Sequence, residues 1–165
     1  MTVATMLSSK KQAFQGVRPL SGIPLGGLGT GSIEIRSDGA LHEWQIFNNP
    51  PWSGGVLPGA PVPPSPVRPG DSLFAIKTRL GNAPPVVRIL RQRDPTEAMY
   101  TYILPYVGNV QEIRYTGEFP FAVLEFGDPT LPVNVTLETW SSFIPGDVKH
   151  SALPAARLGT LTDSR

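Results

Sequence analysis

The sequence of 165 residues contains no cysteine, which excludes disulfide bridges, thiolate metal sites and cysteine nucleophiles. The same absence favours a cytoplasmic protein over a small secreted one. Residues 1–16 show no apolar core and no small-residue cleavage site, so we expect no signal peptide. No apolar run approaches the ~18 residues that a membrane-spanning helix needs, so we expect no transmembrane segment.

Charge is scarce as well. Only 16% of the residues are charged, and 14 Lys and Arg against 13 Asp and Glu leave a net charge of +1. Nucleic acid is not an expected partner, because no basic excess is available to neutralise phosphates. The two histidines, His42 and His150, lie far apart in the sequence, so with no cysteine we expect no metal site.

Glycine and proline are abundant. The 17 Gly and 19 Pro make 36 of 165 residues, about 22%, whereas ~12% is usual for the pair. Proline breaks helix interiors, so long helices and coiled coils are excluded. An apolar fraction of 40% still supplies a core, and the length suits one domain or part of a larger one. These numbers favour a loop-rich all-β protein.

A β-hairpin is the clearest local prediction. Residues 31–36 alternate, with Ile33 and Ile35 on one face and Glu34 and Arg36 on the other, as in a half-buried strand. Ser37-Asp38-Gly39 then predicts a tight turn, because glycine accepts the positive φ of hairpin turns. Residues 40–47 return as the second strand.

Several further short segments read as strands, and together they predict a partial antiparallel β-sandwich. Residues 97–104 are ambiguous, although Tyr100 and Tyr102 favour a strand. No segment shows a helical period over ten residues. The predicted strands are 73–79, 86–90, 110–115, 121–126 and 133–139.

The remaining segments set the predicted organisation. Residues 1–17 read as a polar lead-in, 18–156 as the partial sandwich domain and 157–165 as a divergent polar tail without the apolar strand expected next. Residues 48–70 carry eight prolines and form either a polyproline-II linker or a long loop. We favour the loop, because strand patterns flank it.

The glycine-rich segment 26–31 invites comparison with a phosphate-binding loop. A strand follows it instead of the helix whose N-terminus holds the anion, and the lysine of such loops is missing. We interpret Gly26, Gly27, Gly29 and Gly31 as positions where the backbone passes close to another surface. No cofactor is expected.

A second cluster, Trp44, Gln45, Asn48, Asn49 and Trp52, combines aromatic rings with planar amides next to a turn. Such groups stack on sugar faces and pair with hydroxyls, so the cluster is a candidate substrate-binding or domain-interface site. The alternative is a hydrophobic strand end capped by a turn, because buried aromatic residues are mostly core.

Four ordered blocks carry a resemblance to a known family. They are Ile23–Ser32, Glu43–Asn49, Arg114–Ala122 and Trp140–Asp147, the last of which continues into Ser151–Pro154. Together they resemble the N-terminal region of glycoside hydrolase family 116, which includes the non-lysosomal glucosylceramidases, or bile-acid β-glucosidases. His150 departs from the resemblance, because the family usually has an acidic residue before the block Ser151–Pro154.

The resemblance implies a β-sandwich followed by a larger (α/α)6 barrel that holds the nucleophile and acid/base carboxyl groups of a retaining β-glucosidase. This chain contains no part of that barrel, so no catalytic residue maps onto it and we predict that it is inactive alone. The implied partner is the barrel, and through it a β-glucoside or glucosylceramide-like substrate. Gly26–Gly31 and Trp44–Asn49 are then expected near the interface with the barrel.

Two alternatives remain open: a stand-alone carbohydrate-binding module, which would need an exposed aromatic platform, and a non-functional gene remnant. A sandwich cut within a sheet would also expose unpaired strand edges, so we expect the isolated chain to be poorly soluble or to associate.

Overall fold

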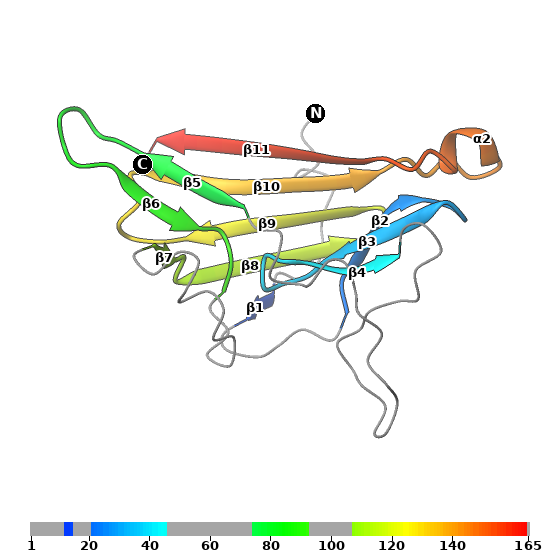
Figure 1. The fold of residues 1–165 in the computed structure, drawn as a ribbon, viewed down its shortest axis with the longest axis horizontal. Coiled ribbons are helices and arrows are strands. Elements are labelled where there is room, and N and C mark those ends of the chain that lie inside the picture. Colours follow the sequence, from blue (N-terminus) through cyan, green and yellow to red (C-terminus); the bar gives the residue numbers. More distant parts are fainter. Residues whose placement is uncertain (1–11, 15–20, 46–73, 93–106, 165) are drawn as a thin grey trace, which may run out of the picture.

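In a computed structural model, the structure describes residues 12–14, 21–45, 74–92 and 107–164. Eleven strands and one short helix, α2, make up the described part, so the all-β prediction is confirmed. The strands form one five-stranded and two three-stranded sheets (Figure 1).

The five-stranded sheet has the order β1-β8-β9-β10-β11 and is antiparallel throughout. Its strands cover predicted ones at 110–115, 121–126 and 133–139. It also adds two strands that were not predicted, one inside the expected lead-in and one in the expected tail. The bounds are β1 Gln12–Phe14, β8 Glu112–Glu118, β9 Phe121–Gly127, β10 Val133–Ser141 and β11 Ala156–Ser164.

The two smaller sheets have the orders β2-β3-β4 and β5-β6-β7. All their pairings are antiparallel except the two-residue parallel contact of β6 with β7. The bounds are β2 Ile23–Gly27, β3 Gly31–Ile35, β4 Leu41–Gln45, β5 Ala75–Thr78, β6 Val86–Ile89 and β7 Gly108–Asn109. Helix α2 spans Val148–Ser151 between β10 and β11.

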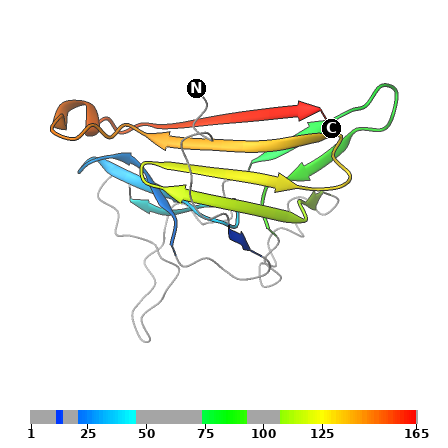
Figure 2. The same ribbon diagram turned by 180° about the vertical axis from the view of Figure 1, so that it is seen from behind.

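The core lies between the large sheet and the smaller ones (Figures 1 and 2). Strand β10 shows why these residues form a sheet: alternate side chains are buried, so one face of the strand meets the core and the other does not. Buried side chains from several sheets make one cluster, among them Leu25, Ile35, Leu41, Ile113, Leu124, Phe126, Val135 and Leu137.

Polar contacts of Tyr115 and Arg88 join the layers. The Tyr115 hydroxyl on β8 accepts from the Ile23 N–H at 3.1 Å and donates to the Ile35 carbonyl at 3.4 Å. Burial, aided by the negative charge of Glu34, raises the pKa of Tyr115 to about 12, although the Ile23 N–H acts in the opposite direction. Arg88 on β6 pairs with buried Asp128 after β9 at 3.0 Å.

The predicted Asp-Gly hairpin is present as β3–β4. Gly39 has φ 80°, and its N–H donates to the Arg36 carbonyl across the turn. The prediction that one face of this hairpin is exposed was wrong. Arg36 is only 3% exposed, and His42 and Glu43 are buried too. A register shift explains part of this: β4 carries an extra residue near Glu43, whose φ of 48° marks a bulge.

Candidate functional site

The glycine-rich segment forms the turn between β2 and β3 and lies directly against the end of α2. The Leu28 N–H donates to the Ser151 carbonyl at 2.9 Å, and the Thr30 hydroxyl donates to the Ala152 carbonyl at 3.0 Å. A Cβ on Gly27 would lie only 2.5 Å from the Ala152 oxygen. The close backbone approach expected of this segment therefore occurs at Gly27, and the surface it meets is the α2 turn.

The connection that carries α2 is held by its own polar contacts. Asp147 caps the helix by accepting from the His150 N–H at 3.0 Å, and its carboxylate also contacts the His150 ring at 2.6 Å. These bonds hold the pKa of Asp147 below its usual value. Buried Ser151 exchanges hydrogen bonds with the backbone of Ile144 in both directions. The glycine-rich turn thus packs on a braced surface.

Trp44 and Gln45 lie at the same end of the molecule. Gln45 pairs in register with Ser32, one residue after the glycine-rich turn, and its side chain is exposed. Trp44 is half-buried and packs on the core, and its Nε1 is buried without a hydrogen-bond partner in the described part of the chain. Asn48, Asn49 and Trp52 lie outside the described residues.

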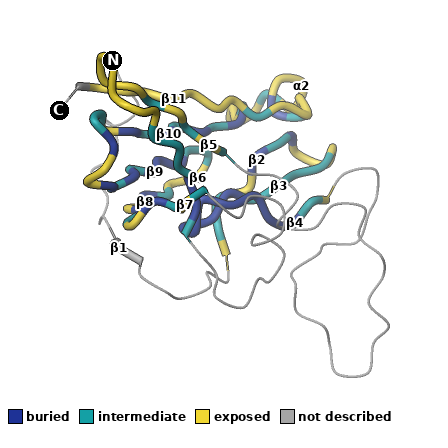
Figure 3. Tube along the Cα trace, turned by 60° about the vertical axis from the view of Figure 1, so that its left-hand side comes forward, coloured by how far each residue is buried: buried dark blue, intermediate teal, exposed yellow. Residues whose placement is uncertain are grey.

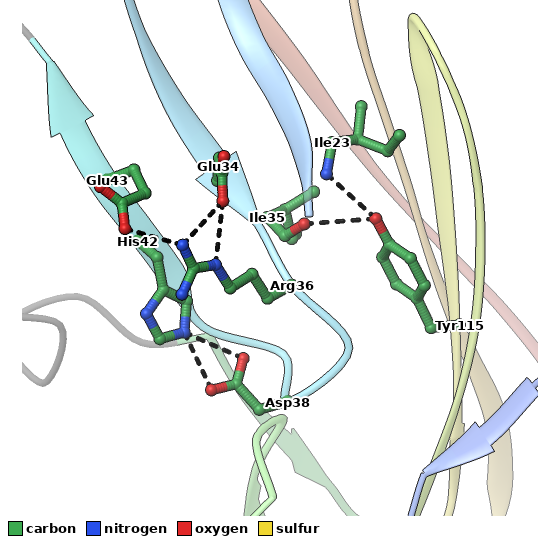
Figure 4. A network of polar contacts seen from close by, with 8 residues as sticks. All are labelled: Ile23, Glu34, Ile35, Arg36, Asp38, His42, Glu43 and Tyr115. Atoms are coloured by element: carbon green, nitrogen blue, oxygen red, sulfur yellow. Dashed lines mark hydrogen bonds and ion pairs between the residues drawn. The ribbon is translucent and has the colours of Figure 1, made fainter. Parts of the chain in front are cut away.

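A network of buried and partly buried charged groups lies in the β3–β4 hairpin (Figure 4). The Arg36 guanidinium lies 2.9 Å from the Glu34 carboxylate and 2.8 Å from that of Glu43. Because Arg36 holds Glu43 at the bulge, the ion pair offsets the cost, about 1 kcal/mol, of a left-handed backbone at a non-glycine residue.

The turn of the same hairpin holds an acid–imidazole pair. His42 Nε2 contacts both Asp38 oxygens, at 2.9 and 3.2 Å. Burial alone would raise the pKa of Asp38. Its hydrogen bonds with His42 and the Ala40 N–H, together with the charges of His42 and Arg91, outweigh burial and lower that pKa. With so little exposed surface, the network is suited to bracing the hairpin rather than to contacting a substrate.

Several large apolar side chains are exposed around α2 and the two turns beside it, and we call this surface the apolar end. Phe119 of the β8–β9 turn and Phe143 stack edge to face, with ring centroids 5.2 Å apart. Val148 of α2 is 74% exposed, and in Figure 3 much of the trace at α2 has the yellow of exposed residues. The apolar end consists of Leu28, Phe119, Phe143, Ile144, Val148 and Leu153.

Comparison with known proteins then decides the family. A sequence profile described as beta-glucosidase 2, glycosyl-hydrolase family 116 N-term, matches residues 22–160. The chain belongs to glycoside hydrolase family 116, as part of its N-terminal domain. The matched residues contain both the glycine-rich turn and the apolar end. A search of curated proteins found no match.

A polar cleft of about 680 Å³ is a separate feature of this family 116 domain. It lies over β8, β9 and β10, and Glu112 on its wall pairs with Arg114 at 2.9 Å. Phe126 is the aromatic residue among the described residues that line it, and at 3% exposure it presents little ring surface to a sugar.

The described residues contain neither a metal-binding cluster nor a membrane-spanning helix. No group of three or more His, Asp or Glu side chains in these ranges is placed to hold a metal ion. The described helix is also neither long nor apolar enough to cross a membrane.

Sequence reasoning missed both the apolar end and the ionic network. The apolar end has a local signal, since Phe119 and the pair Phe143-Ile144 stand in proline-containing turns where polar residues are usual. That these turns meet Leu28 follows only from the pairing of the strands. The ionic network has no comparable signal, because Glu34 and Arg36 read as the solvated face of a strand.

Proposed function

We propose that this chain is a non-catalytic N-terminal portion of a retaining β-glucosidase or glucosylceramidase. In this proposal the apolar end packs against an (α/α)6 catalytic domain, and the N-terminal portion borders the substrate pocket of that domain. The chain's own catalytic contribution is nil. A β-glucoside or glucosylceramide-like substrate then binds to the catalytic domain.

The observation that supports this proposal is the exposure of the apolar end. Its side chains are 40–74% exposed and come from three separate segments that meet around one turn. An exposed apolar surface of this kind typically marks a protein interface, because leaving it in water is unfavourable. At about 25 cal/mol per Å² of apolar surface removed from water, covering such side chains supplies several kcal/mol toward docking.

Rigidity of the surface also supports the proposal. The turn that carries Leu28 is hydrogen-bonded to residues 151 and 152, and α2 is capped by Asp147. A surface held in place before binding loses less conformational entropy on docking. Gln45, exposed beside the same turn, adds a polar group at the rim.

A binding experiment tests the proposal. The 165-residue chain is titrated by calorimetry with a family 116 β-glucosidase catalytic domain from which the native N-terminal domain has been removed. We expect binding by the wild-type chain and a loss of at least tenfold in affinity for Val148→Lys, because a charge would then be buried in the contact.

The matched control is Leu80→Lys in the β5–β6 turn. Leu80 is 71% exposed, as open as Val148, but it lies outside the apolar end. Equal affinities of the Val148→Lys and Leu80→Lys variants, or no binding by the wild-type chain, would refute the proposal.

A further inference from the structure

Strand β11 is the last strand of the five-stranded sheet in the described part of the chain. It ends the strand order, and its nine residues pair with β10 without a register shift. Figure 2 shows β11 at the edge of the sheet, and no other described strand pairs with its second side. The N–H and C=O groups on that side therefore have no partner strand among the described residues. Such a row of groups is a template for another strand.

Several protections of an edge strand are absent from β11. Residues 156–164 contain no proline and no lysine, and the pairing with β10 has no bulge. Leu158 and Leu161 are 45% and 46% exposed, one on each face of the strand. The charged residues of β11 are one arginine and one aspartate, Arg157 and Asp163, so a partner strand of complementary charge can pair with this edge.

The side chains of β11 are complementary to a second copy of the same strand. Arg157 and Asp163 share one face, since both stand at odd positions, and both are exposed. If two copies pair antiparallel about Thr160, Arg157 of each copy stands opposite Asp163 of the other. Leu161 then stands opposite Gly159, which has no side chain to obstruct it.

Neighbouring registers lack this match. A shift that centres the pairing on residue 159 places Arg157 opposite Leu161, and one centred on residue 161 places Asp163 opposite Gly159. Opposite charges directly across a strand pair stabilise it, and like charges destabilise it. The charge pattern therefore selects the register centred on Thr160.

We propose that two copies of this chain associate through β11, antiparallel and centred on Thr160, and join their five-stranded sheets into one continuous sheet. The interface is distinct from the apolar end and does not depend on the catalytic domain proposed above.

Cross-linking tests the register, because the natural chain has no cysteine background. The variant Thr160→Cys is treated with a short bifunctional thiol reagent, with Thr162→Cys as the matched control on the same face of the strand. We expect cross-linked dimers from Thr160→Cys and few from Thr162→Cys. In this register residue 162 of one copy stands opposite Leu158 of the other, so the two cysteines at position 162 are far apart. Equal cross-linking of the two variants would overturn the register.

Sedimentation velocity tests the association itself. We expect a monomer–dimer equilibrium for the wild type, and a dissociation constant raised about tenfold or more in Asp163→Arg, which places two arginines opposite each other at both ends. The double variant Arg157→Asp with Asp163→Arg restores opposite charges and should recover the dimer. A wild-type chain that stays monomeric at all concentrations, or a double variant as weak as the single one, would overturn the proposal. Tryptophan fluorescence confirms that each variant is folded.

Discussion

Replacement of Gly27 by alanine tests how the glycine-rich turn is held against α2. The new Cβ would stand 2.5 Å from the Ala152 oxygen and 2.3 Å from the Thr30 hydroxyl. The hydroxyl can rotate away, but the Ala152 carbonyl is backbone, so the turn and α2 must separate. That movement weakens the hydrogen bonds from Leu28 and Thr30.

The expected cost is about 2–6 kcal/mol, since overpacking costs about 1–3 kcal/mol and each of the two weakened hydrogen bonds costs about 0.5–1.5 kcal/mol. For a chain of this size each kcal/mol lowers the melting temperature by about 2–4 °C, so the loss should be about 4–24 °C. Thermal unfolding followed by tryptophan fluorescence measures it.

Gly29→Ala is the matched control. Nothing lies within 4 Å of its Cβ position, but its φ is +71°, so only the backbone preference of about 1 kcal/mol is lost. If Gly27→Ala proves no more destabilising than Gly29→Ala, the close contact with Ala152 is not what holds the turn.

Three further predictions concern two buried groups and the activity of the chain. Asp38→Asn should destabilise the fold by about 1–3 kcal/mol at neutral pH. Because the folded state lowers the pKa of Asp38, this difference should shrink as the pH falls below about 4, and urea unfolding at several pH values checks it. Tyr115→Phe should cost about 1–3 kcal/mol by leaving the Ile23 N–H without its partner. In the wild type, ultraviolet titration should show one tyrosine ionising near pH 12, and the stability that Tyr115 confers should be complete below pH ~10 and fall above it. The purified chain should release no p-nitrophenol from p-nitrophenyl β-glucoside, and turnover above that of a mock purification would contradict its non-catalytic role.

Local patterns predicted the strands well where one face of the strand meets the core. The alternation of Val133, Val135 and Leu137 identified β10, and Ser37-Asp38-Gly39 identified the β3–β4 turn, because both depend on neighbours in sequence. In the glycine-rich segment, Gly27 lies in close contact with Ala152, whereas nothing lies within 4 Å of the Cβ position of Gly29. Residues 48–70 and 97–104, where a long loop and an ambiguous strand were predicted, lie outside the described residues.

Contacts between distant segments were not predictable in the same way. Strand β11 is polar, and only its nine-residue pairing with β10 makes it a strand. Arg36 reads as a solvent-facing residue until a bulge brings Glu43 beside it. The apolar end was missed for a similar reason, since Leu28 and Phe143 are joined only by the topology of the sheets.

Amide hydrogen exchange tests the central claim, that the apolar end docks on the catalytic domain, most directly. Exchange of the chain is compared with and without a family 116 catalytic domain that lacks its own N-terminal domain. The proposal predicts protection concentrated at residues 27–30, 118–120 and 142–153. Unchanged exchange in these segments, with protection at the β5–β6 turn instead, would contradict it.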